Sequence, residues 1–139
     1  MQIEQFDTGL KIKKNIEDVE ITPIQNLNNK KFVIENFRNI YGLKKINLKK
    51  NLLNIFDKDI KVNCFEPLNE FNGIDNFIEK FWNPLFDAFP DIERRENIIL
   101  GGSFRDKVQV GSYSTLSGFF LKPWLGIKPN FKMINLKCC

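Results

Sequence analysis

The chain has 139 residues, of which 42% are hydrophobic and 27% charged. This composition is that of a folded globular protein and excludes an intrinsically disordered chain, and the length suits one domain with a packed core. The net charge of +4 is small and arises in residues 1–63, which hold 12 basic and 8 acidic side chains. No basic strand with interleaved aromatic residues and no recognition helix accompanies this charge, so we expect no nucleic-acid partner.

The first residues, MQIEQFDTGLKIKK, lack the apolar segment of a secretory signal. No apolar run approaches the ~20 residues that span a bilayer, so we expect a cytoplasmic protein with no membrane partner. Cys64, Cys138 and Cys139 have neither metal-ligand spacing nor a disulfide framework, which predicts reduced thiols. Glu66 and Glu70 lack further metal ligands, and we expect neither a metal nor a cofactor.

Residues 1–29 alternate weakly and end in a polar run, and we interpret them as an N-terminal arm before a domain over residues 30–139. The apolar spacing predicts a helix over residues 32–42 and a second helix over 46–56. Apolar and polar residues then alternate over 60–64, which predicts a half-buried strand.

The apolar residues from Ile74 to Phe89 recur at helical spacing and cover about half of the helix circumference, more than the ~100° stripe that seats a helix on one sheet. Two apolar surroundings are implied. Pro84 lies inside this stretch, where it removes a backbone donor and disfavours the helical conformation at Asn83. We therefore predict a helix that ends near Trp82 and a short helical turn that restarts with Asn83 as its N-cap.

From Glu96 onward the pattern is that of an antiparallel sheet. ENIILGGSF and KVQVGSYSTLSGFF predict two strands joined by a hairpin at Arg105 and Asp106, and FKMINLKCC predicts a third strand after the loop LKPWLGIKPN. Gly101-Gly102-Ser103 lacks the lysine and the following helix of a phosphate loop and predicts a bulge or bend. Helices first and an antiparallel meander last indicate the α+β class, with the helices packed on one face of the sheet.

The segment GIDNFIEKFWNPLFDAFPDIERR, the hairpin after it and the loop PWLGIKPN resemble the SnoaL-like polyketide cyclases of the nuclear transport factor 2-like superfamily. The resemblance extends over about residues 30–139, and FW.PL..AFPD and LGI.P are its most specific parts. It implies a cone-shaped fold in which a curved antiparallel sheet wraps around the N-terminal helices and a deep apolar pocket. By this resemblance the bend at Pro84 turns Trp82 toward the pocket.

The chain departs from the family pattern in two respects. Asn130 and Phe131 stand where the family usually has Thr-Gly after the loop proline, and Asn130 would have to adopt a left-handed conformation to keep that turn. The chain also has no histidine. The family's aspartate acid/base and its histidine usually lie in strands after the one at 133–139, so we expect a domain that lacks its C-terminal strands.

Glu66 is the remaining candidate for a catalytic base. It follows the strand at 60–64 and precedes Pro67, a place similar to the Asp-Pro of the related ketosteroid isomerases. Burial of a carboxylate in an apolar pocket raises its pKa toward values that suit proton transfer at carbon. The alternative for Glu66 is an exposed loop position. Asp91, after Pro90, is interpreted as a cap or turn residue.

Aromatic side chains supply the predicted pocket lining. Core packing is the alternative for Trp82 and Phe86, and packing on the sheet is the alternative for the aromatic residues of the later strands and loop. The predicted lining residues are Trp82, Phe86, Phe81, Tyr113, Phe119 and Trp124.

Two functions remain open at this stage. The first is a cofactor-free cyclase or isomerase, of the ester cyclase type, that acts on small apolar carbonyl compounds. The second is a non-catalytic small-ligand-binding or dimerisation module. The strand at 133–139 carries little charge to block pairing at its free edge, which predicts self-association, with a homodimer as the expected form.

Overall fold

The computed structural model describes residues 20–43 and 45–139, so most of the predicted arm lies outside the described residues. The elements are α1 (Pro23–Leu43), α2 (Leu48–Leu53), β1 (Lys61–Asn63), β2 (Glu70–Asn72), α3 (Ile74–Phe77), the π-helical turn η1 (Ile78–Trp82), α4 (Asn83–Ala88), β3 (Glu93–Phe104), β4 (Lys107–Phe119) and β5 (Met133–Cys138).

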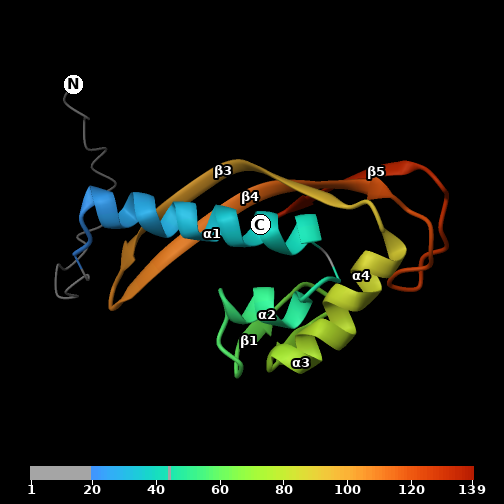
Figure 1. Cartoon of the computed structure of the whole chain (residues 1–139), viewed down its shortest axis with the longest axis horizontal. Coiled ribbons are helices and arrows are strands. Elements are labelled where there is room, and N and C mark those ends of the chain that lie inside the picture. The colour runs from blue at the N-terminus through green and yellow to red at the C-terminus, as the bar shows by residue number, and fades with distance from the viewer. Residues whose placement is uncertain (1–19, 44) are drawn as a thin grey trace, which may run out of the picture.

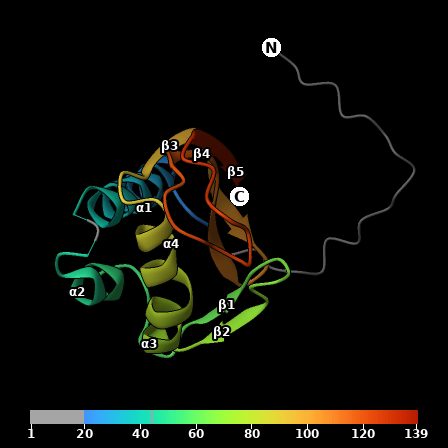
Figure 2. The ribbon, with the colours of Figure 1, turned by 90° about the vertical axis from the view of Figure 1, so that its right-hand side faces the viewer.

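The helices precede an antiparallel three-stranded sheet of order β3-β4-β5, as the sequence predicts, and the sheet does not close into a barrel. Figure 1 shows α1 running along the long β3-β4 ribbon, with α2, α3 and the β1-β2 hairpin farther from the sheet. The view in Figure 2 places α1 and α4 on the same side of this sheet. Among the described residues β5 pairs with β4 alone, so its other edge is free.

Helix α1 begins within the predicted arm. The Thr22 hydroxyl accepts a hydrogen bond from the Gln25 amide at 3.2 Å, and the Gln25 side chain accepts one from the Thr22 amide at 2.9 Å. This reciprocal pair is a capping box, and Pro23 occupies the first helical position that proline favours. The sequence predicts a later start, near Phe32, because the residues of the first turns of α1 are mostly polar and show no clear apolar periodicity.

The predicted helix break at Asn83 is wrong. Asn83 has helical angles, φ −62° and ψ −50°, and its amide donates to the Ile78 carbonyl five residues earlier. The helical stretch continues from α3 through η1 into α4 without a restart, and no side-chain cap is formed at Asn83. The wider π turn accommodates the ring and the missing donor of Pro84, so the chain bends without leaving helical geometry.

The strand predicted over residues 60–64 is confirmed as β1, which pairs with β2, an element that the sequence analysis missed. Strand β2 has only three residues, too few to show alternation in the sequence, although its central residue Phe71 is buried between two exposed neighbours. The two strands form a hairpin whose loop contains Glu66 and Pro67, joined by a cis peptide bond.

The β3-β4 hairpin is confirmed, with Phe104 opposite Lys107 across the turn. The bulge predicted at Gly101-Gly102-Ser103 lies instead at Asn97, between Glu96 and Ile98. Gly101 stays in register and serves packing, because a Cβ there would lie 2.2 Å from Oδ1 of Asn26 on α1. The Asn26 side chain donates to the Gly101 carbonyl at 2.9 Å and ties the start of α1 to the sheet.

The loop before β5 is held by short local contacts. Trp124 and Ile127 exchange backbone hydrogen bonds around Leu125 and Gly126, which both have positive φ. Phe131 has a positive φ of 57°, whereas the sequence analysis considers such a conformation for Asn130. The Asn130 side chain instead accepts a hydrogen bond from the Lys132 amide.

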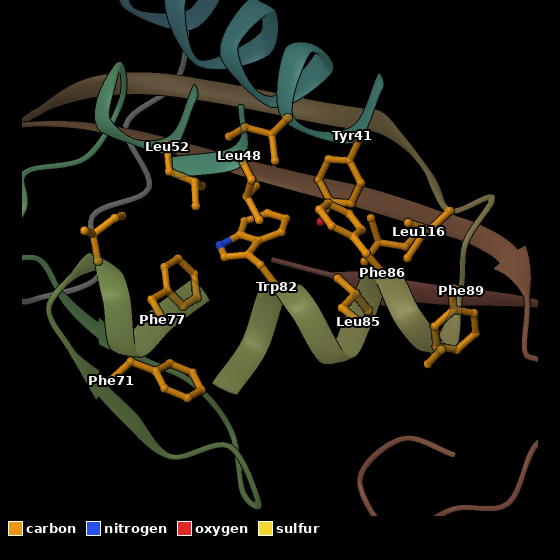
Figure 3. Close-up of a cluster of buried hydrophobic side chains, with 14 of the residues drawn as sticks. Tyr41, Leu48, Leu52, Phe71, Phe77, Trp82, Leu85, Phe86, Phe89 and Leu116 are labelled. Atoms are coloured by element: carbon orange, nitrogen blue, oxygen red, sulfur yellow. The ribbon is translucent and has the colours of Figure 1, made fainter. Parts of the chain in front are cut away.

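An aromatic cluster between the helices forms the centre of the core. Trp82 is 2% exposed, and its indole lies among Phe77, Leu48 and Phe86 (Figure 3). The ring centres of Trp82 lie 5.1 to 5.6 Å from those of four neighbours, Tyr41, Phe77, Phe81 and Phe86. Burial of each such side chain contributes about 1.5–3 kcal/mol, so this cluster anchors α1 and α2 to the α3-η1-α4 helix.

Candidate active site

The face of the sheet that packs against α1 carries a polar cluster. Arg94 and Glu96 of β3 point to this face, as does Ser114 of β4, which pairs with Glu96 and is fully buried. The bulge at Asn97 shifts the alternation by one residue, so that Ile99 and Gly101 then take the inward positions. Without the extra residue, strand alternation would place Ile98 on this face instead.

Arg94 and Glu96 form a buried ion pair. Nε of Arg94 lies 3.1 Å from Oε1 of Glu96, and the two side chains are only 8% and 11% exposed. The remaining guanidinium donors of Arg94 reach Oγ of Ser112 at 3.2 Å and Sγ of Cys138 at 3.9 Å. Residues from β3, β4 and β5 thus hold the guanidinium in one position.

Two aromatic side chains of α1 cover Arg94. Its guanidinium carbon lies 4.2 Å from the ring centre of Phe37 and 5.9 Å from that of Tyr41. Burial raises the pKa of the Tyr41 hydroxyl to about 12, although the positive charge of Arg94 acts in the opposite direction. Tyr41 is therefore a neutral hydrogen-bond donor at physiological pH.

Glu96 keeps one oxygen available. Oε1 accepts the hydrogen bond from Arg94, whereas Oε2 has no hydrogen-bond partner within residues 20–43 and 45–139. Both partners border a half-open cavity of about 400 Å³ between α1 and β3. Its lining consists of Ile34 and Arg38 of α1 and residues 94–99 of β3. The volume falls within the ~300–1,000 Å³ of small-molecule sites.

This arrangement combines a carboxylate, a fixed guanidinium and apolar walls. The carboxylate can accept a proton, and the guanidinium can stabilise negative charge that develops on an oxygen of a bound molecule. Both effects are stronger where little water competes, and the Arg94 and Glu96 side chains are only 8% and 11% exposed. The site has the groups that acid/base chemistry requires.

The predicted pocket residues fall into two groups. Trp82, Phe86 and Phe81 lie together in the aromatic cluster, and none of them is among the residues that line the cavity beside Arg94. Trp124 packs edge-on against Phe89, with its ring centre at 5.7 Å. Nε1 of Trp82 and Nε1 of Trp124 are buried without a hydrogen-bond partner in the described part of the chain.

Tyr113 and Phe119 of β4 lie on the other face of the sheet. Both are partly exposed, and Lys137 of β5 lies over the Tyr113 ring at 5.8 Å. Ile98, Leu100 and Met133 are exposed on this outer face as well. The structure therefore does not bring Tyr113 and Phe119 together with Trp82.

Glu66 lies exposed in the loop between β1 and β2. Its neighbour Glu70 is also exposed, and hydrogen bonds from Asn72 and Lys61 lower the pKa of the Glu70 carboxyl. Asp91 lies in the turn before β3, as interpreted from the sequence, and its carboxylate accepts a hydrogen bond from the Phe119 amide at 2.8 Å. The carboxylate that the fold places in a cavity is Glu96.

Sequence reasoning missed Arg94, Glu96 and Tyr41. A signal was present: Arg94 and Glu96 are two residues apart, so they share one face of a strand, and opposite charges at that spacing can pair. We placed the start of the sheet at Glu96, which left Arg94 outside the strand. Tyr41 falls on the apolar stripe of α1 and resembles any core aromatic.

The cysteines and acidic residues form no metal site in the part of the chain that the structure describes. Cys64 and Cys138 are half-buried with free thiols, and burial raises the pKa of the Cys64 thiol. No helix among the described residues is long and apolar enough to cross a membrane.

Comparison with solved structures identifies the fold. A protein from Jannaschia sp. CCS1 described as a SnoaL-like polyketide cyclase superposes with a TM-score of 0.64 at 21% identity, over 85% of this chain and 76% of that one. The chain has the SnoaL-like fold. AclR of Streptomyces galilaeus, described as a hydroxylase, superposes on this SnoaL-like chain with a TM-score of 0.61 at 15% identity, over 81% of this chain and 75% of its own.

No family model and no curated protein matches the sequence. The SnoaL-like fold is therefore recognised through its three-dimensional arrangement, which the motif resemblance had predicted. At such identities the likeness establishes the architecture of this SnoaL-like chain, whereas the chemistry must be argued from its own side chains.

Proposed function

We propose that this chain binds a small carbonyl compound in the cavity between α1 and β3 and catalyses a cofactor-free, cyclase- or isomerase-type proton transfer on it. One observation carries the proposal: a buried ion pair borders a cavity in a fold shared with a protein described as a polyketide cyclase. Cyclisation of a carbonyl compound through carbon begins with removal of a proton next to the carbonyl, a step that needs a base and charge stabilisation.

The roles follow from the contacts. Oε2 of Glu96 removes the proton, the electron pair of the broken C–H bond forms the C=C bond of an enolate, and the π electrons of the carbonyl move onto its oxygen. The positive charge of Arg94 stabilises the enolate that forms, with Ser112 and Phe37 holding the guanidinium in place. Glu96 then returns the proton to carbon, so no cofactor enters the balance.

Hydrogen exchange tests the proposal without knowledge of the natural substrate. Methyl 4-acetylbenzoate, incubated with the protein in D₂O, is expected to exchange its acetyl protons faster than in buffer, as followed by proton NMR. Glu96→Gln should abolish this acceleration while ligand-induced shifts of cavity resonances persist. Glu93→Gln is the matched control, because this carboxylate lies exposed on β3.

Three results would contradict the proposal. Absence of binding by small aromatic ketones at millimolar concentration would remove the ligand. Exchange that Glu96→Gln leaves unchanged would remove Glu96 from the chemistry. Exchange that Glu66→Gln abolishes would instead support the base expected from the sequence.

A specific observation favours the non-catalytic alternative as well. The outer face of the sheet exposes Ile98, Leu100, Phe119 and Met133, which suits a homodimer formed through this face or through the free edge of β5. Light scattering should then report twice the monomer mass, and Ile98→Lys with Leu100→Lys should restore the monomer.

A cytoplasmic location, which suits the free thiols, remains part of the proposal.

A further inference from the structure

We propose that the ligand of the cavity beside Arg94 carries a carboxylate in addition to its carbonyl, and that Arg38 binds this carboxylate. The inference rests on the proposed function, since it names the class of molecule that the same cavity takes. It starts from the charges on the lining, which are three arginines and one glutamate: Arg38, Arg94, Arg95 and Glu96.

Two of the three arginines already have partners. Arg94 is engaged by Glu96, Ser112 and Cys138 and covered by Phe37. Arg95 has a side chain that is 80% exposed and lies 3.8 Å from the Glu93 carboxylate. The Arg94 guanidinium is therefore occupied, and Arg95, which lies between Arg94 and Glu96 on β3, projects from the opposite face of the strand.

Arg38 is different. It lies one helical turn after Ile34 on α1, so both side chains project from the same side of the helix. It is exposed, lines the cavity and has no ion pair or hydrogen bond within residues 20–43 and 45–139. An unpaired guanidinium at the entrance presents a planar fork of donors that fits a carboxylate in a bidentate arrangement.

The remaining lining sets the orientation of the ligand. Ile34 and Ile99 supply apolar surface in the same lining as the exposed Arg38 and the buried Glu96. A planar molecule placed there has its carboxylate at Arg38 and its carbonyl beside Arg94 and Oε2 of Glu96. Glu96 repels a carboxylate from the inner end, so the two ends of the ligand are distinguished by charge.

A matched ligand pair tests the inference. 4-Acetylbenzoate and its methyl ester differ in one charge, and NMR titration of cavity resonances gives both dissociation constants. We expect the acid to bind about tenfold tighter than the ester, because hydrogen bonds to charged groups are the stronger kind. Arg38→Gln should weaken binding of the acid about tenfold and leave that of the ester unchanged. Arg38→Glu should weaken binding of the acid further.

Lys128→Gln is the control for the loss of one positive charge, since Lys128 lies exposed in the loop before β5 and does not line this cavity. It should alter the preference for the acid by less than about twofold, as expected for a screened surface charge. If acid and ester bind equally, or if Lys128→Gln matches the effect of Arg38→Gln, the carboxylate inference is wrong while ligand binding stands. If neither compound binds, the proposed function fails together with it.

Discussion

Two buried regions of this molecule meet at Tyr41 and differ in what fills them. Around Trp82 the side chains are almost entirely aromatic and aliphatic, and they join the helices (Figure 3). Around Arg94 they are charged and polar, and they join α1 to the sheet. The first region is explained by burial of apolar surface alone. Burial of the charged groups in the second region costs desolvation free energy, so a gain in stability does not explain their presence.

A buried ion pair can often be replaced by apolar residues of similar volume with no loss of stability. Glu96 and Arg94 occupy positions where the sheet could carry two aliphatic side chains, like Leu116 opposite Arg94. Their presence next to a cavity is the reason to place the proposed chemistry in the polar region, whereas burial of apolar surface accounts for the aromatic region.

The largest effect is expected in the aromatic region. Trp82→Ala should lower the free energy of unfolding by about 3–5 kcal/mol, because it leaves a cavity among four aromatic rings. Urea denaturation measures this loss, and Phe65→Ala is the control, since Phe65 is 86% exposed. A loss below ~1 kcal/mol would place Trp82 against an open pocket and restore the lining role expected from the sequence.

The polar region should respond in a pattern that the aromatic region cannot show. Glu96→Gln should cost about 2–3 kcal/mol, because Arg94 then keeps a buried charge without its partner. The double variant Arg94→Met with Glu96→Leu should lose less unfolding free energy than Arg94→Met or Glu96→Leu alone. It should still lose the accelerated exchange of the ketone's acetyl protons. Additive losses in this double-mutant cycle would show that the pair acts as two independent side chains.

Alkaline pH should weaken the contact between the two regions at Tyr41. Its pKa is raised from 10.0 to about 12 in the folded chain, so the unfolded state releases the proton first. The contribution of Tyr41 to the free energy of unfolding is fully present below pH 10. It falls by about 2–3 kcal/mol as the pH rises to 12, at ~1.4 kcal/mol per pH unit. Tyr41→Phe should remove this component of the pH dependence in denaturation curves, and an identical alkaline loss in both proteins would refute it.

The smallest effect concerns the far end of α1, which neither region controls. Gly101→Ala should cost about 1–2 kcal/mol, because its Cβ would meet the Asn26 side chain in a packed site. Gly102→Ala has open space around its Cβ and is the matched control. Asn26→Ala should relieve most of the cost of Gly101→Ala in thermal melts, and failure to do so would indicate backbone strain instead.

The fold could be predicted wherever a local signal matched the final environment. Alternation identified β1 and β5, and the Arg105-Asp106 turn located the β3-β4 hairpin. Periodicity failed where a polar capping box began α1 at Thr22, and where a three-residue strand around Phe71 was too short to show a pattern. The position of the bulge at Asn97 depends on pairing with β4, which no local signal reports.

The site could be predicted only in kind. A carboxylate in a cavity of a SnoaL-like fold was expected, and the expectation went to Glu66 because that residue precedes a proline after a strand. Glu96 owes its environment to α1, which lies more than fifty residues earlier in the sequence and covers Arg94 with Phe37. Contacts of this separation are set by the tertiary fold, so the sequence pattern around Glu96 could not reveal them.

The π turn from Ile78 to Trp82 also has a consequence for ancestry. A π turn contains one more residue than an α turn. This helix therefore aligns with a regular α-helix only when the sequence alignment contains a one-residue gap. An ungapped comparison would put Leu85, Phe86 and Phe89 out of phase with their structural equivalents, even where both helices bury the same face. A one-residue insertion in a helix can thus lower the apparent sequence similarity of two related chains while their folds remain similar.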